Sequence, residues 1–201
     1  YVGHTKLGEA LEADRIMFAI GRRPNTAGLG LEAAGVKLDV NGAVVVDAQS
    51  RTNVPSIYAV GDVTDRVNLT PVAIREGHSF ADTVFGGKPW TADHDLIPTA
   101  VFSQPEIGTV GLTQAEALIR HGAVDVYRAQ FRPMKHTLSG RDEKMLMKVL
   151  VEPETDKVVG VHILGPDAGE LSQVLGIALC HDVSPVERQT GGDVGVGCRA
   201  R

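Results

Sequence analysis

Apolar positions in the first sixty residues fall into short runs that end at or near glycines, a pattern typical of strands separated by turns. Four runs predict strands. They are residues 14–21, which we expect to be buried; residues 36–40 and 43–46, joined by the hairpin signal Asn41-Gly42; and residues 56–60, closed by Gly61-Asp62. This part of the chain therefore has the strand-and-turn character of an α/β domain.

A helix is predicted to begin at Thr70. Thr70 suits the N-cap, and Pro71 suits the first helical position, where its missing N–H costs nothing. Apolar residues recur on one face as far as Phe85, and Gly86-Gly87 ends the helix. Residues 88–95 resemble a linker, and the character of the chain changes there.

The second half of the chain has the pattern of an α+β domain. Thr113 and Glu116 form a capping box that opens a short helix ending at Gly122. Further strands and helices are predicted at residues 124–131, 145–151 and 157–164 (strands, the last two as a hairpin) and 166–180 (helix). Residues 181–201 lack an amphipathic period, and we expect a poorly ordered tail.

Composition excludes several functional classes. The 201 residues carry a net charge of -5 and only 4% aromatic residues, which argues against nucleic-acid binding by a basic patch or by base stacking. No apolar stretch is long enough to span a bilayer, so no membrane role is expected. Two cysteines are too few for a disulfide framework, which fits a cytoplasmic protein. The histidines have no metal-ligand spacing, so no metal site is expected. The sequence does not begin with Met, and we therefore interpret it as starting inside a gene product.

The most informative chemistry lies at Gly61, Asp62 and Thr70. A carboxylate directly after a strand reaches the edge of an open α/β sheet where ligands bind, and as a pure acceptor it suits a polyol. Asp62 capping a turn is an equally good interpretation from spacing alone. The positive end of the helix at Thr70 suits an anion or a partly negative carbonyl, although a plain surface helix is the alternative.

Five segments in the same order resemble the glutathione-reductase family of flavoprotein disulfide reductases. They are residues 19–26 (AIGRRPNT), 52–62 (TNVPSIYAVGD), 69–74 (LTPVAI), 98–113 (PTAVFSQPEIGTVGLT) and 131–140 (FRPMKHTLSG). The LTPVA form resembles glutathione or trypanothione reductases, whereas dihydrolipoamide dehydrogenases usually carry Ala-His at that place. The resemblance covers about residues 10–180.

This resemblance implies a fold of two kinds, α/β followed by α+β. Residues 1–25 would end an NADPH-binding domain, and residues 26–96 would be the returning half of an FAD-binding Rossmann-like domain. Residues 98–180 would be an antiparallel-sheet dimerisation domain, and residues 181–201 a divergent tail. A homodimer through residues 98–180 is therefore expected.

The resemblance also implies cofactor contacts. Asp62, next to Gly61, would meet the ribityl hydroxyls of FAD, and Thr70 would present its backbone to the flavin ring. Leu69 and Ala100 would line the flavin or nicotinamide cleft.

Two further residues carry expectations from the resemblance. Gly21 would line the nicotinamide nucleotide of NADPH, where a missing side chain permits close approach. His78 stands where some members have an arginine that faces a glutathione carboxylate, so His78 is a candidate contact for the substrate.

The family passes electrons from NADPH through FAD and a cysteine pair to a disulfide, here glutathione disulfide. The cysteine pair, both G-x-G-x-x-G motifs and the His-Glu acid pair near the C-terminus are absent from this sequence, and His181 with Glu187 has the wrong spacing. No residue is assigned as catalytic or as a metal ligand, and we expect the isolated chain to be inactive. The alternatives are a non-catalytic dimerisation module, or a trypanothione, mercuric or dihydrolipoamide type of reductase.

Overall fold

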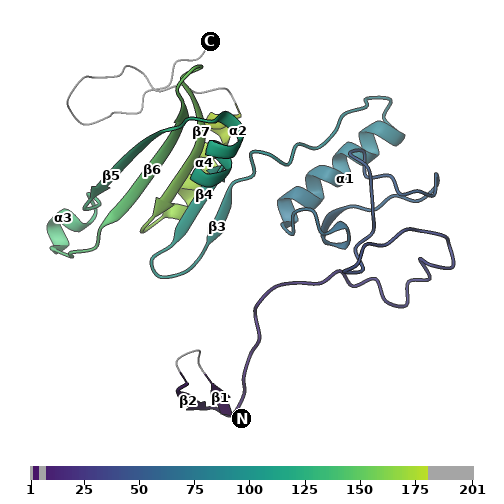
Figure 1. Cartoon of the computed structure of the whole chain (residues 1–201), viewed down its shortest axis with the longest axis horizontal. Helices are drawn as coiled ribbons and strands as arrows, with labels where there is room; N and C mark the ends of the chain where they lie inside the picture. The colour runs from purple at the N-terminus through teal and green to yellow at the C-terminus, as the bar shows by residue number, and fades with distance from the viewer. Residues whose placement is uncertain (1, 5–7, 181–201) are drawn as a thin grey trace. The chain divides into compact units, whose positions relative to one another are not determined.

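A computed structural model describes residues 2–4 and 8–180 (Figure 1). The chain divides into two compact units, an amino-terminal unit (Tyr1–Ala92) and a carboxy-terminal unit (Asp93–Arg201). The tail expected at residues 181–201, with His181 and Glu187, lies outside the described residues. No helix in the described part of the chain is both long and apolar enough to cross a membrane.

The amino-terminal unit begins with a hairpin of β1 (Val2–His4) and β2 (Ala10–Glu12). The prediction of a buried strand at residues 14–21 is wrong. That run contains no regular strand, and Phe18 and Ile20 are 81% and 92% exposed. A strand needs a neighbour to satisfy its backbone groups, and no described segment pairs with this run.

The predicted hairpin of residues 36–40 and 43–46 and the predicted strand at residues 56–60 each form only one isolated β-bridge in the structure. Leu38 pairs with Val44 across the Asn41-Gly42 turn, and Arg51 pairs with Tyr58. Residues 56–60 therefore form no strand, and the chain continues into a short 3-10 helix, η1 (Gly61–Thr64). Side-chain bonds shape the turns: the Asp39 carboxylate, for instance, accepts from the amides of Asn41 and Ala43 at 2.8 Å each.

Helix α1 (Thr70–Val84) is present where the sequence predicts it, but with two corrections. Leu69, in an extended conformation, is the N-cap, so Thr70 is the first helical residue and makes no side-chain cap bond. The buried face consists of Val72, Glu76 and Ser79 rather than the apolar positions that continue to Phe85, which is exposed. The helix buries polar groups because they find partners: Ser79 Oγ donates to the Trp90 carbonyl at 2.6 Å.

The carboxy-terminal unit contains a five-stranded, fully antiparallel sheet in the order β3-β4-β7-β6-β5 (Figure 1). Its strands are β3 (Thr99–Val101), β4 (Ile107–Gly111), β5 (Asp125–Phe131), β6 (Met145–Glu152) and β7 (Lys157–Leu164). The predicted antiparallel sheet and the hairpin of β6 and β7 are confirmed.

Three helices accompany the sheet: α2 (Gln114–His121), the short α3 (His136–Ser139), which the sequence did not predict, and α4 (Ala168–Leu179). The capping box of Thr113 and Glu116 is formed as predicted. Helix α4 packs against β4, and its residues Ala168 and Leu179 join the core side chains Val110, Met145, Val161 and Ile163. Gly108 permits this packing, since a β-carbon there would meet the Ala168 carbonyl oxygen.

Candidate functional site

The Gly61-Asp62 turn is held close against helix α1. Gly61 is buried, and its φ of 74° lies in the left-handed region that favours glycine. A β-carbon at Gly61 would lie 2.9 Å from the Ala73 β-carbon, so any side chain there would push the helix away. Glycine is therefore required twice at this position, by conformation and by space.

Asp62 points outward from this turn. Its side chain is 52% exposed, and Arg22 Nη1 lies 3.9 Å from Oδ2. The backbone carbonyl of Asp62, not its carboxylate, accepts the turn-closing bond from the Asp65 amide at 3.1 Å. The carboxylate thus does not cap the turn, and it remains available as an acceptor for a hydroxyl-bearing ligand.

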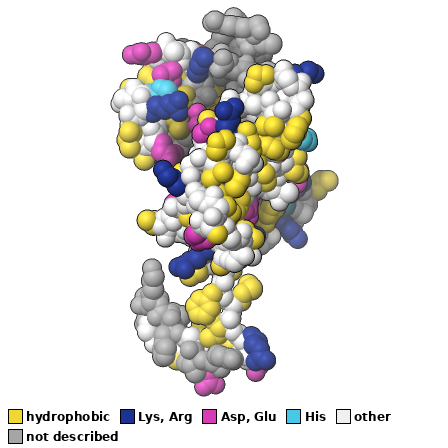
Figure 2. Space-filling view, turned by 90° about the vertical axis from the view of Figure 1, so that its right-hand side faces the viewer, with side chains coloured by type: hydrophobic (Ala, Val, Ile, Leu, Met, Phe, Trp, Pro, Cys, Tyr) yellow, Lys and Arg dark blue, Asp and Glu magenta, His cyan; other side chains and the backbone are white. Residues whose placement is uncertain are grey.

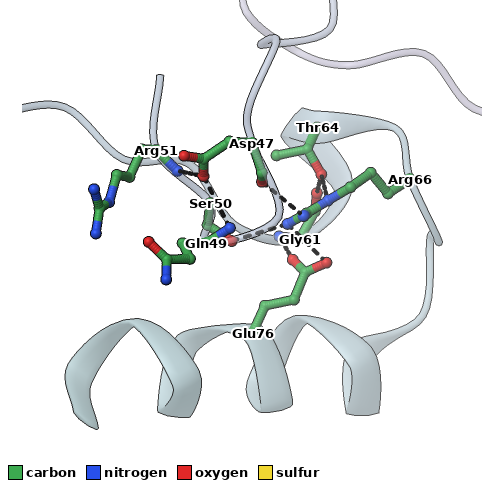
Figure 3. A network of polar contacts seen from close by, with 8 residues as sticks. All are labelled: Asp47, Gln49, Ser50, Arg51, Gly61, Thr64, Arg66 and Glu76. Atoms are coloured by element: carbon green, nitrogen blue, oxygen red, sulfur yellow. Dashed lines mark hydrogen bonds and ion pairs between the residues drawn. The ribbon is translucent and has the colours of Figure 1, made fainter. Parts of the chain in front are cut away.

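A buried carboxylate joins the turn to the helix. Figure 3 shows Glu76 pointing from α1 toward Gly61 and the guanidinium of Arg66. Glu76 Oε2 accepts from the Gly61 amide at 2.6 Å, and Oε1 lies 2.9 Å from Arg66 Nη2. Glu76 is only 2% exposed. Both of its oxygens therefore have a donor, which a buried carboxylate requires.

Arg66 extends this network to a second turn. Its guanidinium donates to Ser50 Oγ at 2.9 Å and to Thr64 Oγ1 at 3.3 Å, and Nη1 lies 3.5 Å from the Asp47 carbonyl oxygen (Figure 3). Thr64 Oγ1 in turn donates to the Gly61 carbonyl at 2.8 Å. The segment 61–66, the turn at 47–51 and α1 are thus fixed to one another.

The amino end of α1 supplies donors. The Leu69 amide bonds to the Val67 carbonyl at 2.9 Å, and the Ala73 amide bonds to the Leu69 carbonyl at 3.0 Å. Helix geometry leaves the amides of Thr70 and Val72 without a carbonyl inside the helix. Leu69 is half-buried and Thr70 is exposed. These N–H groups and the helix dipole suit a partly negative ligand atom.

The donors and acceptors fit the cofactor that the sequence suggests. The hydroxyls of a ribityl chain are donors that match the Asp62 carboxylate, and a flavin carbonyl is an acceptor that matches free helix amides. This fit rests on the exposed Asp62 side chain and on the observed start of α1.

The remaining predicted residues lie elsewhere. Gly21 has a φ of 143° and open space around it, so the described residues build no enclosed site for a nicotinamide nucleotide there. His78 lies on α1 with its side chain exposed. Ala100 is half-buried in β3 of the carboxy-terminal unit.

Sequence reasoning missed Glu76 and Arg66. The one signal for Glu76 was register: it lies four residues after Val72 and three before Ser79, on the stripe that a helix buries. A charge at such a position needs a partner, and helical periodicity does not reveal which residue outside the helix supplies it.

Two histidine contacts in the carboxy-terminal unit are structural. His162 Nε2 lies 3.1 Å from the Leu112 carbonyl and must donate to it, so Nδ1 accepts from the Thr109 hydroxyl at 2.8 Å. Burial lowers the pKa of His162, and the Lys148 charge lowers it further, against the raising effects of the Leu112 bond and Glu116. His121 Nδ1 lies 2.5 Å from Glu152 Oε1. The side-chain bond from Thr155, and then that from His121, lower the pKa of Glu152.

Two family models match the sequence. The pyridine nucleotide-disulphide oxidoreductase model matches residues 2–77, and the dimerisation-domain model of the same family matches residues 97–189. The fold predicted from the sequence, part of an FAD-binding domain followed by an antiparallel dimerisation domain, is thereby confirmed.

Curated relatives agree with this assignment. The chain is 57% identical over 172 residues to glutathione reductase of Burkholderia cepacia, covering 86% of this chain and 38% of that protein. It is 52% identical to the chloroplastic/mitochondrial glutathione reductase of Pisum sativum, over 82% of this chain and 30% of that protein. It is also 49% identical to trypanothione reductase of Trypanosoma congolense, over 86% of this chain and 35% of that protein. The chain thus spans well under half the length of these relatives.

A solved structure is similar as well. The HOCl-induced flavoprotein disulfide reductase RclA from Escherichia coli aligns with a TM-score of 0.75 and 26% identity, covering 89% of this chain and 41% of that one. Two family models, relatives of up to 57% identity and a shared fold agree with one another. The chain belongs to the pyridine nucleotide-disulphide oxidoreductases, the family of flavoprotein disulfide reductases that includes the glutathione reductases.

Proposed function

We propose that this chain is the carboxy-terminal portion of an NADPH-dependent flavoprotein that reduces glutathione disulfide in the cytoplasm. The observation that carries the proposal is the 57% identity to a bacterial glutathione reductase over 86% of the chain, with the Asp62 carboxylate exposed on the loop that contacts α1. FAD, when bound, transfers electrons from the nicotinamide to a disulfide. The cysteine pair that completes this transfer is absent from the sequence, so the chain alone would not turn over.

The residues of this chain would bind and orient FAD. Asp62 would accept hydrogen bonds from the ribityl hydroxyls, held in place by the adjoining Gly61. The Thr70 amide would donate to the flavin ring, with the half-buried Leu69 beside it. The partial positive charge at the amino end of α1 would favour negative charge on the flavin ring and would thereby stabilise the reduced flavin.

Three further contacts belong to this proposal. Gly21 would lie along the nicotinamide nucleotide of NADPH, and Ala100 would line the flavin or nicotinamide cleft. His78, exposed on α1, would face the glutathione substrate. In this proposal residues 1–25 end the NADPH domain and residues 26–96 complete the FAD domain.

A role as a dimerisation module is the second candidate function. Figure 2 shows hydrophobic side chains on the molecular surface, and in the carboxy-terminal unit the exposed ones include Phe102, Ile119, Val174 and Ile177. Exposed apolar side chains of this kind favour association. We propose that the sheet of residues 98–180 pairs with a second copy or with an intact reductase subunit.

A chimera tests the proposed flavin enzyme. Residues 10–180 replace the matching segment of the Burkholderia cepacia relative, and FAD content and NADPH oxidation are measured with glutathione disulfide or trypanothione disulfide. We expect bound FAD and a preference for glutathione disulfide. Retention of activity only with trypanothione disulfide would overturn the substrate assignment.

Two variants of the chimera test the acceptor. Asp62→Asn keeps the shape of the side chain but replaces an acceptor oxygen with a donor, so FAD affinity should fall at least tenfold. Asp14→Asn makes the same change at an exposed aspartate of the same unit and should leave the affinity unchanged. Equal FAD affinity in the two variants would contradict the role of Asp62.

The isolated chain tests the second function. Sedimentation of the purified chain should show a dimer, with no NADPH oxidation. A monomer at all concentrations would exclude self-association, while turnover would contradict the expected inactivity.

A further inference from the structure

The network around Glu76 surrounds the segment that carries Asp62 and has no part in the chemistry described above. A carboxylate that loses water on burial is destabilising unless donors replace the water. Both carboxylate oxygens of Glu76 have such a donor: the Gly61 amide donates to Oε2, and the Arg66 guanidinium pairs with Oε1. Both of these donors belong to a single loop.

The two donors stand on either side of Asp62. Gly61 directly precedes it, and Arg66 follows it four residues later, beyond the end of η1. One side chain of α1 therefore holds both ends of the segment 61–66 (Figure 3). The exposed Asp62 side chain lies between the two anchored points.

The same helix residue also fixes the distance between loop and helix start. Glu76 is about 1.7 turns along from Thr70 on α1, and Gly61 touches Ala73 of that helix. Movement of the Gly61 amide away from Glu76 would shift Asp62 relative to the free amides at the start of α1.

We infer that Glu76 is a positioning residue for the flavin: its carboxylate, bonded to the Gly61 amide and paired with Arg66, sets the place of Asp62 relative to the start of α1. This inference rests on the proposed flavin site. A carboxylate is needed because it accepts from two donors at once. A glutamine at this position has one acceptor oxygen, so it can accept from only one of the two donors, the Gly61 amide and the Arg66 guanidinium. Its NH₂ group, itself a donor, would face the other one.

The loop contact is tested on the full chain by amide hydrogen exchange. Glu76→Gln is nearly isosteric, so the fold should persist. We expect exchange of the Gly61 amide to accelerate at least tenfold. The Gly42 amide, bonded to the Asp39 carbonyl at 3.1 Å in a separate turn, is the internal reference and should not change. Glu12→Gln, at an exposed position, is the matched control. An unchanged Gly61 rate would overturn the inference.

The flavin role is tested in the chimera by a double-mutant cycle on FAD affinity. Glu76→Gln should weaken FAD binding about tenfold. Because Glu76 acts through Asp62, adding Glu76→Gln to Asp62→Asn should weaken binding little further. Fully additive losses would mean that Glu76 acts only on general stability and would overturn the inference.

The cycle also separates the two proposals. A loss in Asp62→Asn with none in Glu76→Gln overturns the positioning role and leaves the flavin site standing. No loss in Asp62→Asn overturns the flavin assignment of Asp62 itself, and with it the role of Glu76 toward the flavin.

Discussion

Gly61 lies so close to Ala73 of helix α1 that a β-carbon at Gly61 would come within 2.9 Å of the Ala73 β-carbon. Contacts this short essentially never occur between real β-carbons, so the turn and the helix can meet only through glycine. The contact holds the loop that carries the Asp62 carboxylate against the first turns of α1.

Gly61→Ala should therefore destabilise the amino-terminal unit. A left-handed φ of 74° costs an alanine about 1–2 kcal/mol, and overpacking adds about 1–3 kcal/mol. Urea denaturation followed by tyrosine or tryptophan fluorescence measures the loss.

Gly28→Ala is the matched control for that measurement. Gly28 has a nearly equal φ of 78°, but no atom lies within 4 Å of its would-be β-carbon. The difference between the two variants isolates the clash with Ala73. Equal losses would show that the helix does not approach Gly61 this closely.

The carboxy-terminal unit should lose stability as the pH falls below 6.5. Burial lowers the pKa of His162 from its ordinary value of 6.5, so the unfolded chain binds the proton first. The stabilisation is complete above pH 6.5 and decreases as the pH falls through the lower pKa of the folded state. A protonated ring would also lose the bond from the Thr109 hydroxyl to Nδ1.

Denaturation midpoints between about pH 7.5 and 5 measure this effect in the wild type and in His162→Gln. We expect a smaller dependence on pH in the variant, whereas His78→Gln, in the other unit, should leave it unchanged. Identical pH profiles for wild type and His162→Gln would contradict the assignment. NMR titration of His162 gives the pKa directly.

Gly108→Ala should separate helix α4 from strand β4. The added methyl group would collide with the Ala168 carbonyl oxygen and lie 3.0 Å from the Ser172 β-carbon. Overpacking of this kind costs about 1–3 kcal/mol or more. Faster amide exchange in α4, at residues such as Leu171, is the expected readout, and unchanged exchange there would count against this packing.

Gly77→Ala, unlike Gly61→Ala and Gly108→Ala, should increase the stability of the protein. Gly77 lies inside α1, and no atom lies within 4 Å of the place that an added methyl group would take, so alanine adds helix propensity without a clash. We expect a gain of about 0.5–1 kcal/mol in the free energy of unfolding. A loss of stability would reveal a contact at this position that the structure does not contain.

Much of the carboxy-terminal unit could be predicted because its signals are local. The capping box of Thr113 and Glu116 satisfies the start of α2 by itself, and the apolar runs of β6 and β7 flank a short polar turn between them. The sequence likewise predicted α1, although its first residue was misplaced by one position because Leu69 supplies the extended N-cap.

Residues 14–21 show where a local pattern is insufficient. Their apolar content favours a strand, but strand formation depends on a partner backbone, and no described segment provides one. Glu76 shows a second limit, because its register places it on the buried stripe of α1 but does not reveal which residues outside the helix pair with its charge. Its burial depends on Gly61, fifteen residues earlier, and on Arg66.

By itself, the sequence determined the order of the main elements of the carboxy-terminal unit, the position of α1 and the family, since each depends on residue types close together along the chain. Only the tertiary structure decided that Gly61 touches Ala73 and that Glu76 is buried beneath the loop of Asp62. Such contacts join residues distant in sequence, and the donors that make a buried charge tolerable become visible only when the chain is folded.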